Sequence, residues 1–441
     1  MKNRVLILGA GLVTKPVIIY LLDRGYQVTI ASLLVSKIDP IVAGYKNATT
    51  KELDVLKDTE ALSREVEAND IVISLLPAVH HIVVAKQCII HKKNLVTSSY
   101  VSPAMQELHS KAKELGLLFL NECGLDPGID HMSAMKTIHE VEKQGGKITS
   151  FSSYCGGLPS LRYNNNPFGY KFSWSPRGAV LAGKNSARFM KNKEIVDIPG
   201  EELFEHYEFI DIPGLGTFEG YPNRNSLGYI EKYNLQDIQT MFRGTLRYVG
   251  HCETWRNMVK LGLANDEKKY DFRTISPANF LSLLIGQKEA SDLKKAIAEY
   301  LGISPYSVFL NKIEWLGLLS RHTVELKEGT ALDLLVYLLE KKLQYAEGET
   351  DLVVLQHEFI AEYPDHKEKI ISTLIDEGIQ GGDTAMARTV SWPAAIATKL
   401  ILNRQINMTG VQIPVHPEIY EPILKELQEL KISIQEKKIL L

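Results

Sequence analysis

Two glycines near the amino terminus have the spacing of a phosphate-binding turn. The run Gly9-Ala10-Gly11-Leu12-Val13 follows the apolar residues 5–8 and precedes a segment whose apolar residues recur with a helical period. Gly9 permits a tight turn, Gly11 lets the backbone approach a pyrophosphate, and a helix beginning near Val13 would direct its free N–H groups at that anion. The third glycine of the usual fingerprint is replaced by Thr14. We interpret this segment as a dinucleotide cradle; the alternative is an ordinary strand-to-helix turn.

The residues that follow the second predicted strand, 26–31, should determine whether the protein binds NAD or NADP. An acid at this position accepts the ribose hydroxyls and disfavours a 2′-phosphate. Here the chain continues as Ser32-Leu33-Leu34, and the first acid is Asp39. Ser32 can donate a hydrogen bond to a phosphate and Lys37 can reach one, which favours NADP. If both are only surface residues, the pocket accepts NAD instead.

Asp126 is the first candidate for acid–base chemistry. It follows the apolar residues 117–121, so we expect it at the carboxyl edge of the sheet, where open α/β sheets bind ligands. Pro127 can start the next helix, which predicts Asp126 as its N-cap. This capping role is the alternative to catalysis, and the two roles can coexist.

The same segment does not predict a metal site. Asp126, Asp130 and His131 lie close together in the sequence, but no further ligands occur at a convincing spacing. We therefore expect no metal, and we expect His131 to be a helix side chain with a hydrogen-bond partner.

Two further segments offer hydroxyl or thiol groups for proton transfer. Thr97-Ser98-Ser99-Tyr100 ends the fifth predicted strand, where small hydroxyls can bond cofactor or substrate and Tyr100 can donate a proton. Cys155 lies beside Gly156-Gly157, and glycines in a strand indicate a close backbone approach to a ligand. The alternatives are a polar loop with Tyr100 packed against it and a buried, inert cysteine.

Three arginines in the middle of the chain have the chemistry to hold carboxylates. Arg224 follows Tyr221-Pro222-Asn223, and the run Arg243-Gly244-Thr245-Leu246-Arg247-Tyr248 contains two more. A guanidinium fork binds a carboxylate with two parallel hydrogen bonds. As a set, these residues are suited to a substrate with several carboxylates; the alternative is that each forms a surface ion pair.

The elements that must position these residues alternate between strand and helix over the first 126 residues. Strands are predicted at 5–8, 26–31, 49–53, 70–76, 94–98 and 117–121, and helices at 13–24 and 102–115. Strand–helix units of this length predict a parallel, doubly wound α/β sheet with right-handed crossovers.

The pattern changes after Asp126. We predict a helix at 128–143, a strand at 147–154, a helix-rich stretch at 253–342, a hairpin at 351–376 and a helix at 384–402 that is interrupted or bent near Pro393. The sequence has no internal repeat and no low-complexity linker, which indicates interleaved domains.

Composition excludes several classes of protein. The 441 residues carry 50 Lys and Arg against 53 Asp and Glu, a net charge of −3, which argues against a dedicated nucleic-acid binder. A hydrophobic content of 45% excludes a wholly disordered chain, and no run approaches the ~20 apolar residues of a membrane span. The four cysteines contain no Cys-x-x-Cys pair, so we expect reduced thiols in a cytoplasmic protein. The first residues lead directly into a glycine turn and are expected to form a strand rather than a signal peptide.

Several long motifs resemble one known family. They are Gly124 to His131, Tyr154-Cys155-Gly156-Gly157-Leu158-Pro159, the residues Asn166 to Ser175, and Arg243 to Tyr248. The chain resembles the saccharopine dehydrogenases that form L-glutamate, which are called saccharopine reductases in fungi and form the C-terminal half of the animal aminoadipic semialdehyde synthase. The resemblance runs almost from end to end, as far as Pro417-Glu418-Ile419-Tyr420.

The resemblance implies an activity and an architecture. The family interconverts saccharopine with glutamate and 2-aminoadipate 6-semialdehyde, using NADP in fungi and NAD in animals. It implies a Rossmann domain over 1–126 plus 385–441, a mixed α/β substrate and dimer domain over 127–252 plus 345–384, and a small helical insert over 253–344. A homodimer that binds only small molecules, and neither nucleic acid nor membrane, is expected.

The resemblance also implies a set of site residues. With the glycine turn, the expected cofactor contacts are Gly9, Ala10, Gly11, Leu12, Val13, Ser32, Leu33, Leu34, Asp54, Val55, Leu75, Thr97, Ser98, Leu125, Asp126, Pro127 and Ser175. The expected substrate contacts are Ser99, Tyr100, Asp126, Arg224, Thr245, Leu246 and Arg247. Asp126, Tyr100 and Cys155 are the candidate proton handlers. Fungal relatives carry an arginine near Leu33 and animal relatives an aspartate; this chain has neither.

Two other functions remain as alternatives. One is a related enzyme of reductive condensation, such as a carboxynorspermidine dehydrogenase, whose substrate carries fewer carboxylates. The other is a non-catalytic dinucleotide-binding sensor, which would keep the glycine turn without needing Asp126 and Arg224 together.

Overall fold

The chain folds into two compact units. This computed structural model describes residues 3–287 and 292–441. The first unit consists of the residues up to Thr149, a short piece from the middle of the chain, Lys232–Leu235, and the segment Leu355–Leu441. The second unit consists of Ser150–Glu231 and Gln236–Val354. Because Lys232–Leu235 interrupts the second unit, the chain crosses between the units several times.

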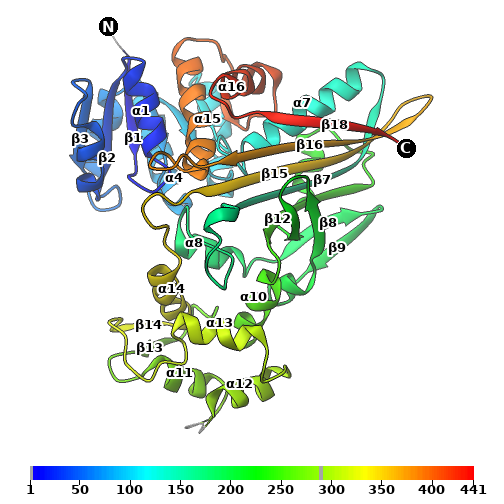
Figure 1. Cartoon of the computed structure of the whole chain (residues 1–441). Coiled ribbons are helices and arrows are strands. Elements are labelled where there is room, and N and C mark those ends of the chain that lie inside the picture. Colours follow the sequence, from blue (N-terminus) through cyan, green and yellow to red (C-terminus); the bar gives the residue numbers. More distant parts are fainter. Residues whose placement is uncertain (1–2, 288–291) are drawn as a thin grey trace. The chain divides into compact units, whose positions relative to one another are not determined.

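The first unit is built on a parallel sheet (Figure 1). Its strands are β1 (Arg4–Leu8), β2 (Gln27–Ser32), β3 (Ala48–Glu52), β4 (Ile71–Ser74), β5 (Asn94–Thr97), β6 (Leu118–Leu120) and β17 (Gly410–Gln412). They lie in the order β17-β6-β5-β4-β1-β2-β3, and every neighbouring pair is parallel. This is the order of a doubly wound nucleotide-binding sheet, so the predicted Rossmann-type fold is confirmed.

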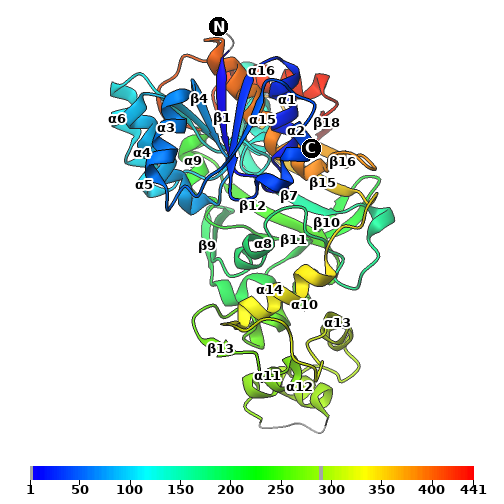
Figure 2. The same cartoon turned by 90° about the vertical axis from the view of Figure 1, so that its left-hand side faces the viewer.

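Helices cover both faces of this sheet. They are α1 (Lys15–Asp23), α2 (Asp39–Val42), α3 (Thr59–Ala68), α4 (His81–His91), α5 (Pro103–Gln106), α6 (His109–Glu114) and α15 (Ala385–Leu402). Figure 2 shows α3, α4, α5 and α6 on one side of the strands and α1 and α15 on the other. Alternate strand residues such as Leu6, Val72 and Phe119 pack in one cluster with Leu62 of α3 and Val84 of α4. The continuous apolar runs in the sequence reflect this burial on both faces.

Two helix predictions in the first unit need correction. The helix predicted from residue 13 begins at Lys15. The helix predicted over 102–115 is broken into α5 and α6, although Ser102 does cap α5 by accepting a hydrogen bond from the N–H of Met105. The break lies at Leu108, whose N–H bonds the carbonyl of Met105, three residues back, and so tightens the last turn.

The prediction that Asp126 caps the next helix is wrong. That helix, α7 (Ile129–Lys143), has Gly128 as its N-cap residue, and the N–H of Gly128 donates to Oδ1 of Asp130 at 2.5 Å. The preceding loop folds back on itself, since the N–H of Gly124 donates to the carbonyl of Pro127. Gly128 has a φ of +150°, and a Cβ placed there would lie 2.0 Å from the carbonyl oxygen of Gly124. Asp126 is therefore held before the helix rather than at its end.

The carboxyl-terminal part of the first unit contains a hairpin and three further elements. β15 (Asp351–Glu362) and β16 (Lys367–Glu377) form the predicted hairpin, with the N–H of Tyr363 bonded to the carbonyl of His366 at 2.8 Å. β18 (Ile434–Leu440) pairs antiparallel with β16, and α16 (Pro417–Glu429) precedes it. α15 runs from Ala385 to Leu402 through Pro393, so of the predicted interruption or bend near Pro393 the interruption is absent.

The second unit contains a mixed sheet. Its strands are β7 (Lys147–Pro159), which begins in the first unit, β8 (Ala187–Lys191), β9 (Glu194–Ile198), β10 (Glu208–Ile212), β11 (Gly216–Pro222) and β12 (Thr240–Tyr248). β12 lies between β11, to which it is antiparallel, and β7, to which it is parallel. The strand predicted to end at residue 154 continues to Pro159. Its residues Ser150 to Cys155 pair with Thr240 to Thr245.

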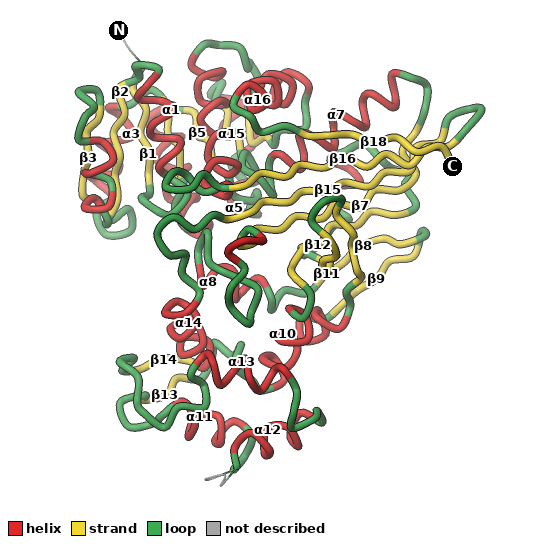
Figure 3. Tube along the Cα trace, in the orientation of Figure 1, coloured by secondary structure: helices red, strands yellow, loops and turns green. Residues whose placement is uncertain are grey.

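Helices make up most of the rest of the second unit (Figure 3). They are α8 (Pro176–Ala182), α9 (Gly228–Lys232), α10 (His251–Lys260), α11 (Pro277–Leu284), α12 (Leu293–Leu301), α13 (Val308–Leu316) and α14 (Ala331–Lys342), with the two short strands β13 (Lys269–Asp271) and β14 (Glu328–Thr330). One buried cluster joins Phe280 of α11 and Leu335 of α14 to Phe189 of β8 and Tyr221 of β11. Among residues 3–287 and 292–441, no helix combines the length and the apolar character of a membrane span.

Candidate active site

The turn between β1 and α1 has the geometry of a pyrophosphate site. Gly9 has a φ of +116°, and a Cβ there would come within 2.9 Å of the carbonyl oxygen of Leu75, so only glycine fits. A Cβ at Gly11 would meet no atom within 4 Å, which leaves open space above the turn. No side chain caps α1, and the hydroxyl of Thr14 is buried without a hydrogen-bond partner. The first turn of α1 therefore offers backbone N–H groups to an anion.

The ends of β2 and β3 present polar groups beside exposed apolar side chains. Oγ of Ser32 accepts a hydrogen bond from the N–H of Leu34 at 3.1 Å, which leaves the hydroxyl proton for an external acceptor. Leu33 and Leu34 are exposed, as expected of residues that cover a planar base. Beyond β3, hydrogen bonds from the N–H groups of Leu56 and Lys57 lower the pKa of the Asp54 carboxyl, so it is ionised and held in place. A free hydroxyl, two exposed apolar side chains and an ionised carboxylate together have the chemistry to bind a dinucleotide.

The ends of β5 and β6 bring two candidate proton handlers together. The hydroxyl of Tyr100 donates to Oδ1 of Asp126 at 3.0 Å. Both residues belong to loops at the carboxyl edge of the parallel sheet, and each is partly buried. A carboxyl group and a phenol in hydrogen-bond contact can transfer a proton between them.

Glu122 is a site-supporting residue that the sequence motifs did not single out. It is 1% exposed and has a left-handed backbone, φ +55°. Its carboxylate accepts from the N–H of Val101 at 3.1 Å and from Nε2 of His131 at 2.8 Å. Burial would raise the pKa of Glu122, but the hydrogen bond and charge of His131 and the charge of Lys232 hold it at about 2. An ionised Glu122 thus ties the Tyr100 loop to α7.

His131 has the role expected of it. Its Nδ1 contacts the hydroxyl of Tyr233 at 2.6 Å while its Nε2 contacts Glu122. Tyr233 belongs to the short mid-chain piece of the first unit, which places a residue far away in sequence beside α7. In the described part of the chain, no three His, Cys, Asp or Glu side chains converge to hold a metal ion.

Arg247 is a buried cation of the second unit. Its side chain is 9% exposed, Nη1 donates to the carbonyl of Leu246 at 2.7 Å, and Cζ lies 5.0 Å from the ring centre of Tyr170. Nε is buried without a partner, and among the described residues no carboxylate pairs with this guanidinium. Tyr221, His251 and Arg247 line a cavity of about 20 Å³. Burial, then the charges of Arg247 and Lys312, lower the pKa of His251 well below its usual value, so His251 is neutral beside Arg247.

The other predicted residues of the second unit have diverse surroundings. Arg224 is exposed on the loop after β11, whereas Arg243 is buried with Cζ 4.4 Å from the ring centre of Tyr229. Cys155 is buried on β7 opposite Thr245 of β12. Oγ of Ser175 accepts a hydrogen bond from the N–H of Gly178 and so caps α8.

The predicted site residues are divided between the units. The first unit contains the glycine turn, the ends of β2 to β5, Tyr100 and Asp126, together with Ser98, Ser99, Leu125 and Pro127. The second contains Cys155, Ser175, Arg224, and Thr245 to Arg247. The structure shows contact between Tyr100 and Asp126, and it shows Cys155 and Thr245 as strand partners.

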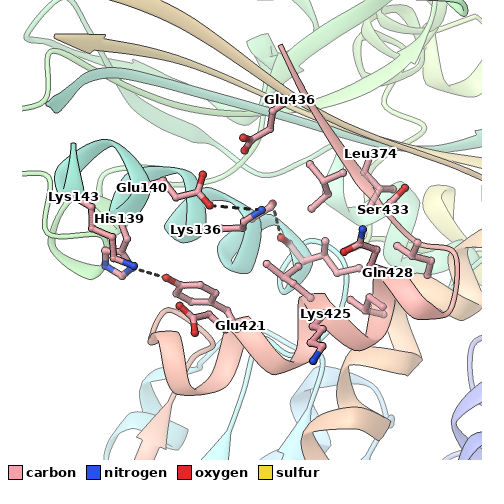
Figure 4. Close-up of a pocket in the computed structure, with 17 residues that line it drawn as sticks. Lys136, His139, Glu140, Lys143, Leu374, Glu421, Lys425, Gln428, Ser433 and Glu436 are labelled. Atoms are coloured by element: carbon pink, nitrogen blue, oxygen red, sulfur yellow. Dashed lines mark hydrogen bonds and ion pairs between the residues drawn. The ribbon is translucent and has the colours of Figure 1, made fainter. Parts of the chain in front are cut away.

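A cavity of about 450 Å³ in the first unit lies outside this set (Figure 4). It is lined by α7, α16, β16 and β18, with an ion pair between Lys136 and Glu140 at 3.7 Å and a hydrogen bond between His139 and Tyr420 at 2.7 Å. None of the predicted catalytic or binding residues lines it. Acidic and basic side chains alternate around it, so we assign it no ligand.

A doubly wound sheet with a phosphate turn and an acid–phenol pair at its carboxyl edge defines a dinucleotide-dependent dehydrogenase. Matches of the sequence to protein-family models identify the family of dehydrogenases. Residues 5–120 match the saccharopine dehydrogenase NADP binding domain, and residues 124–432 match the saccharopine dehydrogenase C-terminal domain. The chain belongs to the saccharopine dehydrogenase family, which confirms the resemblance seen in its motifs.

Individual members of this family are similar in sequence to almost the whole chain. The chain is 40% identical to the saccharopine dehydrogenase [NADP(+), L-glutamate-forming] of Pyricularia oryzae over 96% of both chains, and 40% identical to that of Saccharomyces cerevisiae over 97% of both. It is 39% identical to the mitochondrial alpha-aminoadipic semialdehyde synthase of Bos taurus, matching 97% of this chain and 47% of that protein.

Two solved structures have the same fold as this chain. An apo saccharopine dehydrogenase (L-Glu forming) from Saccharomyces cerevisiae superposes with a TM-score of 0.88 and 39% identity, covering 99% of this chain and 100% of that one. A homospermidine synthase from Legionella pneumophila, at 12% identity and a TM-score of 0.61 over 100% of this chain and 92% of that one, shares the fold alone.

Proposed function

We propose that this chain interconverts saccharopine with L-glutamate and 2-aminoadipate 6-semialdehyde, using NADP, in lysine metabolism. The observation that carries the proposal is the Tyr100–Asp126 contact at the edge of a nucleotide-binding sheet, in a chain similar over its full length to NADP-dependent, L-glutamate-forming enzymes. The buried Arg247 supports it further, because saccharopine has three carboxylates to be held.

We assign the cofactor to the first unit. Backbone N–H groups of the Gly9 to Val13 turn and of α1 would hold the pyrophosphate, and the Ser32 hydroxyl with Lys37 would meet the 2′-phosphate. Leu33 and Leu34 would cover the adenine. The nicotinamide of bound NADP would supply the acceptor for the hydride that leaves the carbon next to the secondary amine of saccharopine.

The protein's own groups handle protons and charge. In the oxidative direction, Asp126 accepts the proton of the secondary amine, and the Tyr100 hydroxyl orients the carboxylate that receives it. Water then adds to the imine carbon, and the carbinolamine collapses to the aldehyde while a proton returns to the departing glutamate nitrogen. Arg247 and Arg224 hold substrate carboxylates, and Cys155 is a third candidate for moving a proton.

The proposal includes the wider setting of the enzyme. We propose a homodimer in the cytoplasm, with a Rossmann domain over 1–126 plus 385–441, a substrate and dimer domain over 127–252 plus 345–384, and a helical insert over 253–344. The four buried thiols support a reducing compartment. Light scattering after gel filtration measures the oligomeric state directly.

Turnover of defined substrates tests the function. The purified chain is incubated with saccharopine and either NADP or NAD while the absorbance of the reduced nicotinamide is followed. We expect reduction of NADP with release of glutamate in equal amount. Turnover of carboxynorspermidine in place of saccharopine would identify the related condensing enzyme, and binding of NADPH without turnover of either would identify a sensor.

A further inference from the structure

A buried imidazole joins three hydroxyl groups at the carboxyl edge of the parallel sheet. His81, the first residue of α4, is 4% exposed. Its Nδ1 lies 2.8 Å from Oγ of Ser74, at the end of β4. Its Nε2 lies 2.8 Å from Oγ of Ser99 and 3.1 Å from Oγ1 of Thr97, at the end of β5. One ring therefore fixes two strand ends and the loop that follows them.

The ring is neutral at ordinary pH. Burial, together with the nearby His80, lowers the pKa of His81 to about 4. A neutral imidazole has one N–H and one lone pair, and a hydroxyl can complement either. Both nitrogens are thus engaged in either tautomer, so rotation of the ring would break hydrogen bonds on both sides.

Ser99 is held by its backbone as well as by its side chain. Its N–H donates to Oγ1 of Thr97 at 3.3 Å, and its carbonyl accepts from the N–H of Glu122 at 3.0 Å. Within the described residues, the Ser99 hydroxyl has one side-chain partner, Nε2 of His81. A hydroxyl can donate one hydrogen bond and accept two, so Ser99, which is only partly buried, retains capacity for a ligand.

The next residue in the chain belongs to the candidate acid–base pair. Tyr100 directly follows Ser99 and donates to Asp126. Ser99 and Tyr100 belong to one loop at the carboxyl edge of the sheet, so a substrate that meets the acid–phenol pair can also present a polar group to Ser99. The direction of the Ser99 hydroxyl, which His81 sets, then decides how that group is held.

We propose that His81 is a positioning residue that orients the Ser99 hydroxyl toward a polar group of the amino-acid substrate. The inference rests on the proposed function, since it assigns a role within the same site. It predicts that the hydrogen bond from Nε2 to Ser99, rather than the one from Nδ1 to Ser74, contributes to substrate affinity.

Two isosteric variants separate these hydrogen bonds. In His81→Asn the amide lies near the position of Nδ1, so the contact with Ser74 remains and the contacts of Nε2 with Ser99 and Thr97 are lost. In His81→Gln the amide reaches the position of Nε2 and keeps the contact with Ser99. We expect His81→Asn to raise the KM for saccharopine about tenfold, the value of one net hydrogen bond, with the KM for NADP within about twofold of wild type. His81→Gln should restore the KM for saccharopine to within about threefold of wild type.

His91→Asn is the matched control. His91 is at the other end of α4, and its Nε2 contacts Oγ of Ser63 at 2.7 Å, so the same kind of hydrogen bond is removed far from the sheet edge. Both KM values should remain those of the wild type. Circular dichroism of each variant checks that it is folded.

Ser99→Ala completes the test without changing the helix. It should raise the KM for saccharopine as much as His81→Asn does, and the double variant should be no worse than either single one. A wild-type KM for Ser99→Ala, additive effects, or an equal rise in the KM for NADP would each overturn the role of His81. A wild-type enzyme that does not oxidise saccharopine would instead refute the proposed function, and the role of His81 with it.

Discussion

Asp126 and Tyr100 are in direct contact at the carboxyl edge of the sheet, and both groups can move a proton. The 3.0 Å hydrogen bond places the phenol on the carboxylate, and the loop from Gly124 to Gly128 holds Asp126 ahead of α7. Sequence alone placed Asp126 at this edge of the sheet from the strand before it. The alternative role as a helix N-cap was wrong, because an N-cap and a loop residue before a glycine cap have the same local signature of acid followed by proline.

Replacing Asp126 tests its role in proton transfer. We expect Asp126→Asn to lower kcat for saccharopine oxidation about 10²-fold, because the amide cannot accept the amine proton, with little change in the binding of NADPH. Tyr100→Phe, which keeps the carboxylate, should have a smaller effect. Steady-state kinetics and NADPH fluorescence titration measure the two quantities. A wild-type kcat in Asp126→Asn would move the acid–base role to Cys155 or to water.

Ser32 provides a second test at the scale of one residue. Its hydroxyl is free to donate to a phosphate because its oxygen accepts from Leu34. Ser32→Asp should shift the ratio of kcat/KM from NADP toward NAD by about 10²-fold, since a carboxylate repels the 2′-phosphate. Ser36→Asp adds the same charge on an exposed turn nearby and should leave the ratio unchanged. An unaltered ratio in Ser32→Asp would show that the end of β2 does not select the cofactor.

Among the elements, the start of α7 is the most tightly constrained. The Gly124–Gly128 loop precedes it, and Glu122 and His131 join the loop to the helix. Gly128 must be glycine here, because its φ is +150° and the backbone of Gly124 occupies the place of a Cβ. The sequence showed the glycines but not the contact that requires them.

Gly128→Ala tests this junction. The new Cβ would overlap Gly124 at 2.0 Å in a backbone conformation that alanine rarely adopts, so we expect a loss in the free energy of unfolding of about 3 kcal/mol or more. Gly145→Ala is the matched control, because Gly145 has a φ of +78° but open space around it, and it should cost only about 1 kcal/mol. Urea unfolding gives both values, and equal costs would contradict a steric role for Gly128.

The stability of the whole molecule should depend on pH through its buried titrating groups. His81 has a folded pKa of about 4, below its ordinary value of 6.5, so the unfolded chain binds more protons between these values. Its contribution, on the order of 3 kcal/mol, is complete above pH 6.5 and is lost as the pH falls toward 4. Glu122, at about 2 against 4.5, adds a second loss below pH 4.5.

Thermal melting across pH 4 to 7 measures this dependence. The wild-type Tm should fall as the pH is lowered through 6.5, and His81→Gln should show a flatter profile over the same range. His91→Gln, which keeps the buried His81, should follow the wild type. Parallel profiles for His81→Gln and the wild type would show that His81 does not titrate in this window.

The sequence predicted the sheet well because its strands are continuous apolar runs. β1, β4, β5 and β6 begin or end within two residues of the predicted bounds. β3 gave a weak signal because it is a partly exposed edge strand of polar residues. The break at Leu108 depends on one three-residue hydrogen bond, which no periodicity reveals.

The site was less predictable for a different reason. Gly9, Asp126 and Arg247 lie in local motifs, whereas His81 and Tyr233 act through partners far away in the sequence. His81 meets Ser99 across 18 positions, and Tyr233 meets His131 across 102. Such contacts follow from the fold and have no signature in a single sequence.

The place of β17 in the sheet affects how the protein folds while it is being synthesised. β17 covers the outer edge of β6 but is formed by Gly410 to Gln412, which the ribosome adds long after Leu118 to Leu120 of β6. While the ribosome translates the intervening residues, the nucleotide-binding sheet has an uncovered strand that can pair with another nascent chain. A stop codon shortly before Gly410 would leave that edge open permanently, so such truncated products are expected to aggregate rather than persist as a smaller cofactor-binding protein.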